Sequence, residues 1–291
     1  MGINRENITS FIDYYNSKNF VIKVQKKLSY FHKQIFIAIL LRFEKIWITH
    51  KKIFTGDIMK IVLPDNISSS LYLVGFFEGE ETKAFFHLMK PGDTFIDIGA
   101  HIGYYSVLAN AVGGDESKIV AIEPTPSTFT ILKENLKNKS NVSKLNIGLF
   151  SINGTIEFND FGIRYMCLNS FKDARLDQKI SGEKLTIPVK TLDSVVDELK
   201  IRPTLIKIDA ESAELDIIKG GVNTLSSDNI KIFLEVGDYE NTGLNNSIQI
   251  IEALEKLDYN TYEFRNNQFI LHDKRQGKYP SMSLYFSKAP I

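Results

Sequence analysis

The stretch TFIDIGAHIG, residues 94–103, decides the fold of this chain. Its first half is an apolar, β-branched run that ends at Asp97, and its second half carries Gly99 and Gly103, which let a strand turn tightly into a helix. The run KIVAIEP follows, and Glu123 ends its apolar part 20 residues after Gly103. A strand, a glycine turn, a helix and a second strand closed by an acid are typical of a nucleoside-binding crossover.

The spacing of the two glycines restricts the ligand. It is GxxxG and not the GxGxxG of a pyrophosphate fingerprint, because the bulky His101 occupies the place of the middle glycine. Asp97 and Glu123 stand at strand ends, where ligands bind in open α/β sheets, and Glu123 can accept hydrogen bonds from both hydroxyls of a ribose. Two carboxylates also suit a cation. S-adenosylmethionine fits, since it has a ribose, an ammonium and a sulfonium but no phosphate.

Strands and helices alternate regularly from residue 94 onward, which predicts an α/β fold with a mostly parallel, doubly wound sheet. Segments such as TLIKID and IKIFLEV are nearly continuous in apolar residues, as in strands covered by helices on both faces. The predicted strands are 94–98, 118–123, 142–149, 204–209, 230–236, 259–264 and 282–287. The predicted helices are 80–88, 103–112, 127–138, 192–199, 213–225 and 246–257, and residues 154–190 are a β-rich insertion.

The N-terminal part differs from the rest in charge and pattern. Residues 1–60 hold 11 Lys/Arg and 4 Asp/Glu of the 35 and 35 in the chain, so this part is near +7 and the remainder near −7. A basic, aromatic-rich helix over 18–54 that packs its apolar side on the body is the favoured interpretation, and a membrane-surface or partner-docking helix is the alternative. Strands over 56–63 and 71–76 are predicted to follow.

Composition excludes several classes of protein. The single cysteine, Cys167, rules out an internal disulfide and a multi-cysteine zinc site, and makes a reducing, cytoplasmic setting the expectation. Zero net charge argues against a general nucleic-acid binder. The polar start predicts no signal peptide, and the longest apolar run, residues 35–41, is too short for a bilayer that needs about 20 residues. We therefore expect a cytoplasmic protein, soluble or peripheral at a membrane.

Four motifs together resemble one family. DIGAHIGYYSVLA, IVAIEPTPSTFTILKENL, VKTLDSVV and LIKIDAESAELDIIKGG resemble, in this order, the FkbM-type class I S-adenosylmethionine-dependent methyltransferases. The resemblance covers about residues 76–236. It implies a Rossmann-like, seven-stranded methyltransferase sheet within a domain over 55–291, preceded by the helical extension over 1–54. It also implies S-adenosylmethionine as methyl donor and a hydroxyl of a sugar, glycan or other small metabolite as acceptor.

The resemblance also implies roles for single residues. Asp97, Gly99 and Gly103 would line the methionine end of the cofactor, Glu123 would hold the ribose, and Ser151 would lie near the adenine. The cofactor-binding residues so implied are Glu78, Glu81, Asp97, Gly99, Gly103, Glu123, Ser151 and Asp209. An acid-rich helix N-terminus explains Glu78 and Glu81 equally well.

Methyl transfer to a hydroxyl needs an acceptor placed in line behind the methyl carbon and a base for its proton. Asp209 is the first candidate base, with capping of the following helix as its alternative. Glu211, from the same motif, faces the methyl by the resemblance, and Glu235 and His101 are further candidates. No metal site is expected.

Two motifs depart from the family, at His101 and at Ala210 and Ser212. Asn is usual where this chain has His101, and KIDVEGAE is usual where it has KIDAESAE. Ser212 therefore replaces a glycine that could serve a close backbone approach.

Other functions stay open. A NAD-binding oxidoreductase shares the strand, turn and acid pattern but requires GxGxxG. A non-catalytic scaffold would use the N-terminal helix to contact a membrane or a glycosyltransferase. A nucleic-acid partner is disfavoured, because Asp-Ala-Glu-Ser stands where base methyltransferases have Asn/Asp-Pro-Pro-aromatic.

The acceptor, a small molecule or saccharide, is expected beside the insertion, whose Arg164, Tyr165 and Arg175 suit an anionic or sugar-like group.

Overall fold

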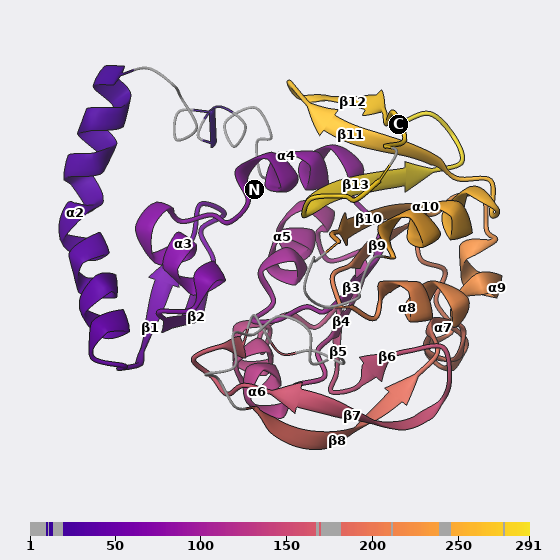
Figure 1. Cartoon of the computed structure of the whole chain (residues 1–291), viewed down its shortest axis with the longest axis horizontal. Helices are drawn as coiled ribbons and strands as arrows, with labels where there is room; N and C mark the ends of the chain where they lie inside the picture. Colours follow the sequence, from indigo (N-terminus) through magenta and orange to yellow (C-terminus); the bar gives the residue numbers. More distant parts are fainter. Residues whose placement is uncertain are drawn as a thin grey trace.

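The computed structural model describes residues 10, 12–13, 20–166, 169, 182–210, 212–238, 246–275 and 277–291. Glu211, Cys167 and Arg175 lie outside these ranges. Figure 1 shows an α/β body with a smaller N-terminal unit at its side. Within the described ranges, no helix combines the length and the apolar character needed to cross a bilayer.

The body is built on an eight-stranded sheet of order β12-β11-β13-β10-β9-β3-β4-β5. The parallel strands are β3 (Thr94–Ile98), β4 (Lys118–Ile122), β5 (Val142–Leu145), β9 (Leu205–Ile208) and β10 (Lys231–Val236). Strand β13 (Met282–Ser287) runs antiparallel between β10 and β11 (Asn260–Arg265). All seven predicted strands contribute to this sheet, and β12 (Gln268–Leu271) is an unpredicted eighth strand that extends the edge beyond β11.

Helices cover both faces of the sheet, so the doubly wound prediction is confirmed. One apolar core lies under α4 (Gly79–Leu88), α5 (Tyr104–Gly113) and α6 (Pro126–Asn135). The other lies under α7 (Leu192–Leu199), α8 (Glu214–Lys219), α9 (Val222–Leu225) and α10 (Ser247–Glu255). The single helix predicted over 213–225 is divided into α8 and α9 at a glycine pair. A Cβ on Gly220 would lie 2.3 Å from the carbonyl oxygen of Phe150, so the chain approaches a neighbouring backbone there.

The predicted strand over 142–149 is interrupted. Its end forms β6 (Gly148–Leu149), which leaves the main sheet and joins β7 (Gly154–Asp160) and β8 (Glu183–Lys190) in a small sheet of order β6-β8-β7. The amide of Asn146 donates to the carbonyl oxygens of Glu123 and Pro124, at 2.8 and 2.9 Å, and holds the chain between the two strands. The prediction of a β-rich insertion is confirmed by β7 and β8.

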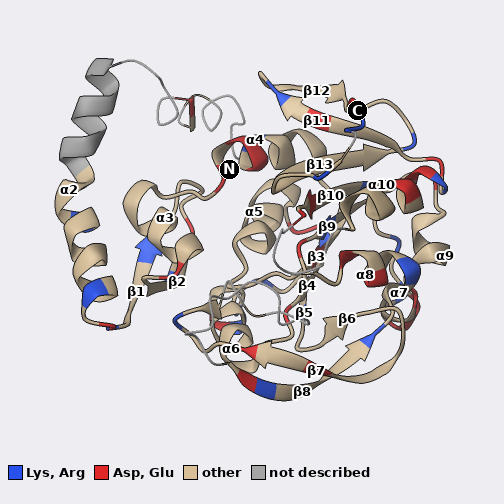
Figure 2. Ribbon diagram, viewed as in Figure 1, with Lys and Arg blue, Asp and Glu red and all other residues tan. Residues whose placement is uncertain are grey.

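The N-terminal unit corrects two predictions. The helix predicted over 18–54 ends early, because α2 (Phe20–Arg42) is followed by β1 (Trp47–Lys52), which pairs antiparallel with β2 (Ile58–Leu63). The boundary predicted after residue 54 therefore falls inside a hairpin. The strand predicted over 71–76 is instead the end of α3 (Asn66–Val74). Basic residues are visible on α2 and β1 in Figure 2.

Local capping explains why α3 is a helix. Asp65 accepts a hydrogen bond from the backbone N–H of Ser68 at its start, and Gly75, with a φ of 85°, ends it in the left-handed conformation. Strand β1 forms because WITHKK, rich in β-branched and aromatic residues, finds a partner in β2.

Candidate active site

A cavity of about 300 Å³ lies at the carboxyl ends of β3, β4, β9 and β10. Strand order reverses between β3 and β9, and open α/β sheets bind ligands at such a point. The cavity is lined by seven of the predicted site residues: Glu78, Asp97, Gly99, His101, Glu123, Asp209 and Glu235. Residues far apart in the sequence are thus brought together as the topology predicted.

Gly99 joins the loops that follow β3 and β9. Its φ is 75°, and a Cβ at this position would lie only 1.8 Å from the carbonyl oxygen of Asp209. Its backbone N–H donates to the carbonyl of Ile122, at 3.0 Å, which ties the turn to β4. Gly103, with a φ of 88°, lets the chain enter α5, but it does not line the cavity. The first glycine therefore permits a close backbone approach, and the second permits a turn.

Glu123 is held rigidly at the end of β4. One carboxylate oxygen, Oε2, accepts the backbone N–H of His101 at 3.0 Å, and the other, Oε1, accepts that of Thr125 at 2.9 Å. Burial raises the pKa of this carboxyl group, while the neighbouring imidazole and these hydrogen bonds oppose the rise. A carboxylate oxygen can accept more than one hydrogen bond, so Glu123 keeps acceptor capacity toward the cavity.

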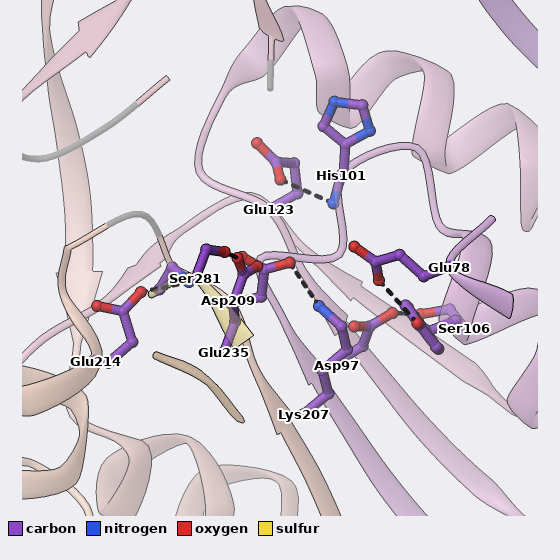
Figure 3. A network of polar contacts seen from close by, with 12 residues as sticks. Glu78, Asp97, His101, Ser106, Glu123, Lys207, Asp209, Glu214, Glu235 and Ser281 are labelled. Carbon is purple, nitrogen blue, oxygen red and sulfur yellow. Dashed lines mark hydrogen bonds and ion pairs between the residues drawn. The ribbon is translucent and has the colours of Figure 1, made fainter. Parts of the chain in front are cut away.

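His101 has a structural reason to replace the asparagine usual in the family that this turn resembles. Its φ is 52°, in the left-handed region, where Asn, Asp and His are the better tolerated side chains. Its Nε2 lies 3.7 Å from Oδ1 of Asp65, beyond hydrogen-bond distance. Both ring nitrogens and that Asp65 oxygen are buried and have no hydrogen-bond partner in the part of the chain that the structure describes. Figure 3 shows the ring pointing away from the Lys207–Asp209 pair, so its position does not favour His101 as the base.

Lys207, which the sequence analysis missed, lies at the centre of the site. Its side chain is only 5% exposed, and its Nζ donates to Oδ2 of Asp209 at 2.8 Å. The ammonium also lies over the rings of Tyr105 and Phe233, at 5.1 and 5.8 Å from their centroids. Burial by itself would lower the pKa of Lys207, but the surrounding carboxylates outweigh burial and raise the pKa above its usual value. The sequence signal that could have identified Lys207 is a single lysine inside the otherwise apolar strand LIKI.

Two further carboxyl groups face this lysine (Figure 3). Asp97 is buried, accepts a hydrogen bond from Ser106 Oγ at 2.7 Å, and leaves its Oδ1 without a partner among the described residues. Burial raises its pKa, and Lys207 opposes the rise. Glu78 accepts a hydrogen bond from the Tyr105 hydroxyl at 3.0 Å, and burial raises its pKa to about 8. With Asp209, three carboxyl groups surround this ammonium, and Glu123 and Glu235 also line the cavity.

Asp209 follows β9, and its side chain is 34% exposed. The alternative that Asp209 caps the following helix is not supported. No side chain caps the start of α8 in the described residues, and Oε1 of Glu214 accepts the backbone N–H groups of Ala210 and Ser212 in the preceding loop, at 3.1 and 3.2 Å. Glu235, at the end of β10, accepts a hydrogen bond from Ser281 Oγ.

Two other predicted residues lie away from the cavity. Ser151 donates from its hydroxyl to Asp216 at 3.3 Å, and Glu81 lies in the first turn of α4. The wall on the side of the insertion is formed instead by Leu149, Phe158, Met166 and Asn169. In the described ranges, no group of three or more His, Cys, Asp or Glu side chains has the arrangement of a metal site.

Ser212 is held in a conformation that favours glycine, since its φ is 85° and it is buried. Replacing Ser212 by Gly is expected to raise the free energy of unfolding by about 0.5–1 kcal/mol, because the left-handed strain on the Cβ is relieved. Urea denaturation measures this. Ser212→Ala is the matched control, because it removes the hydroxyl and keeps the Cβ. An equal gain in both variants would trace the effect to the hydroxyl and not to the backbone.

Comparisons with known proteins agree with this geometry. A family model described as the Methyltransferase FkbM domain matches residues 97–261, more than half of the chain. The hexuronic acid methyltransferase AglP of Haloferax volcanii is 30% identical over 146 residues, which are 49% of this chain and 56% of that protein. Methyltransferase sdnD of Sordaria araneosa is 28% identical over 159 residues, 45% of this chain and 61% of that protein. The chain thus spans little more than half the length of these curated relatives.

Among solved structures, methyltransferase FkbM of Methylobacillus flagellatus KT aligns with a TM-score of 0.45 and 16% identity, over 77% of this chain and 56% of that chain. A putative S-adenosylmethionine-dependent methyltransferase of Streptococcus mutans aligns with a TM-score of 0.46 and 12% identity, over 83% of this chain and 55% of that chain. Both TM-scores are below 0.5, so these two structures do not assign the chain to a family. The family model does.

Proposed function

The chain belongs to the FkbM family of methyltransferases, and we propose that it binds S-adenosylmethionine in the cavity and methylates a hydroxyl group of a saccharide or other small metabolite. The observation that carries the proposal is the charge of the site. Glu78, Asp97 and Asp209 surround the ammonium of Lys207 at the strand ends, and Glu123 and Glu235 add two more carboxyl groups to the cavity. An excess of carboxyl groups favours a ligand that is itself cationic.

The residues present fit such a cofactor. Glu123 would accept the ribose hydroxyls, since both its oxygens are fixed by backbone donors and keep acceptor capacity. Asp97, whose Oδ1 has no hydrogen-bond partner among the described residues, and Glu78 would hold the ammonium. Leu149, Phe158 and other apolar residues of the insertion side would border the adenine. Bound S-adenosylmethionine supplies an electrophilic methyl group on a sulfonium.

The chain's own contribution to transfer would be positioning and proton removal. Lys207 holds Oδ2 of Asp209, whereas Oδ1 of Asp209 has no hydrogen-bond partner in the described ranges and could accept the proton of the acceptor hydroxyl. Glu235, on the neighbouring strand, is the second candidate base. Holding the hydroxyl in line with the methyl remains the larger requirement.

Calorimetry with S-adenosylmethionine tests cofactor binding. We expect Glu123→Gln to weaken binding by about tenfold or more, because a charge-assisted hydrogen bond to the ribose is lost. Glu157→Gln is the matched control, since Glu157 is exposed on β7 and should leave affinity unchanged. Transfer of labelled methyl to hexuronic acid saccharides and neutral saccharides then tests the acceptor. A folded protein that shows no binding at millimolar S-adenosylmethionine would overturn the proposal.

Glu78 adds a proton signature to the same experiment. With its pKa raised to about 8, Glu78 is mostly protonated at pH 7 in the free protein. A cationic ligand favours the ionised form, so binding at pH 7 should release a proton and affinity should rise between about pH 6 and 8. Binding enthalpy would then depend on the ionisation enthalpy of the buffer, and Glu78→Gln should remove most of that dependence. A buffer-independent enthalpy in the unaltered protein contradicts this role.

A further inference from the structure

The outer surface of α2 carries large apolar side chains that are about half exposed in the described part of the chain. Phe31, Ile35, Ile39, Leu41 and Phe43 are 45 to 65% exposed, and we refer to them together as the α2 surface. Phe31, Ile35 and Ile39 recur every four residues and form one stripe along the helix. Figure 1 shows α2 at the edge of the molecule, with α3 and the β1–β2 hairpin between it and the main sheet.

The opposite side of α2 packs on β1 and α3. Phe36 contacts Trp47 and Tyr72, with ring centroids 5.0 and 6.5 Å apart, and Leu40 is buried. A surface helix normally presents polar residues to water on its remaining side. Over residues 35–41, IFIAILL, α2 has none. The fold therefore does not account for the exposed stripe, and a contiguous apolar surface of this kind indicates an interaction site.

The charge of this region identifies the kind of partner. Residues 30–52 hold five Lys/Arg and one acid, Glu44, for a net charge of 5 − 1 = +4. Burial and the nearby Lys33 together lower the pKa of Lys51, which indicates two ammonium groups held close to each other. No acidic side chain of the described residues forms an ion pair with either lysine. Lys33 lies 5.5 Å over the ring of Tyr72, on the packed side of α2, whereas the exposed Arg42 and Lys45 form no ion pair with an acidic side chain of the described residues.

We infer that the α2 surface docks on an anionic lipid bilayer. A second copy of the chain would bring the same positive charge against itself, which disfavours a dimer through this surface. A bilayer with anionic lipids supplies both missing components, an apolar interior for Phe31, Ile35 and Ile39 and phosphate groups for the exposed Arg42 and Lys45. The helix lies along the bilayer surface and does not cross it.

Docking has a consequence for the cavity. Helix α3 packs against α2, and its first residues, Asn66 and Ile67, line the cavity. The cavity is therefore connected to the docked helix through α3. On the proposed function, and only on it, this connection favours an acceptor hydroxyl carried by a lipid-linked molecule over one that is free in solution.

Vesicle flotation with the full-length protein tests docking. We expect the protein to float with vesicles of phosphatidylcholine and phosphatidylglycerol at low salt, to float far less with phosphatidylcholine alone, and to detach as salt is raised. The double variant Ile35→Glu/Ile39→Glu should reduce flotation by about tenfold or more, because two apolar insertions are lost. Its matched control is Ile270→Glu/Leu271→Glu, an exposed apolar pair on β12, which should float like the unaltered protein.

Three results would overturn the inference. They are no flotation on anionic vesicles, equal flotation of the α2 variant and the unaltered protein, and a dimer that the α2 variant dissociates without any vesicle binding. Thermal unfolding checks that both double variants are folded. Flotation needs no S-adenosylmethionine, so failure to dock leaves cofactor binding intact, and failure to bind the cofactor leaves docking intact.

Discussion

Replacing Gly99 by alanine is expected to abolish binding of S-adenosylmethionine and to lower the free energy of unfolding by about 3 kcal/mol or more. The new Cβ would lie 1.8 Å from the carbonyl oxygen of Asp209, and a backbone atom cannot rotate away as a side chain can. The loops after β3 and β9 would have to separate, and the carboxylates of Asp97 and Asp209 would move apart. Chemical denaturation and calorimetry measure the two losses.

Gly92→Ala is the control for this prediction. Gly92 has a φ of 81°, similar to the 75° of Gly99, but a Cβ there would meet nothing within 4 Å. The control variant therefore carries the cost of the left-handed backbone alone, about 1–2 kcal/mol, and keeps its affinity for the cofactor. Equal losses of stability in the two variants would show that the contact between the loops is not what requires glycine.

Replacing Lys207 by methionine is expected to lower the free energy of unfolding by about 3–5 kcal/mol at pH 8, because buried carboxylates lose their counter-charge. Without the ammonium, the pKa values of Asp97 and Glu78 rise further above those of the unfolded chain. The folded variant then binds more protons than its unfolded form. Its stability relative to the unaltered protein therefore falls as pH rises from about 4.5 through 8, and the deficit is smallest at acidic pH.

Denaturation at several pH values checks this prediction. Lys184→Met is the matched control, since Lys184 is exposed and its ion pair with Glu157 should contribute little. A loss that stays constant from pH 5 to 8 would trace the effect of Lys207→Met to altered packing against Tyr105 and Phe233 and not to uncompensated charge.

The parts of the site that the sequence predicted are those set by topology. Acids at strand ends, such as Asp97, Glu123 and Asp209, can be placed without knowing their neighbours, because parallel strands present their carboxyl ends at one edge. Lys207 could not be placed in this way. Its role depends on Glu78 and on aromatic rings from other elements, and a lone lysine in a strand carries no periodic signal.

The errors in the predicted fold also come from contacts between elements that lie apart in the sequence. Strand β1 forms because β2 lies beside it, and the break between β5 and β6 depends on the contacts of Asn146 with the loop after β4. These are tertiary causes that a local pattern does not contain. For α3 a local signal existed, with Asp65 as N-cap and Gly75 as terminator, and it was outweighed by the apolar run between them.

The place of β13 bears on the order in which the fold can be completed during synthesis. Strand β11 precedes β13 in the chain, yet it reaches the main sheet only through pairing with β13. Until residues 282–287 have left the ribosome, the β11–β12 hairpin has no strand of the main sheet to pair with, and the edge of β10 stays open. Closure of the sheet at this point therefore waits for β13, and the edge of β10 stays exposed from the synthesis of β10 until that of β13.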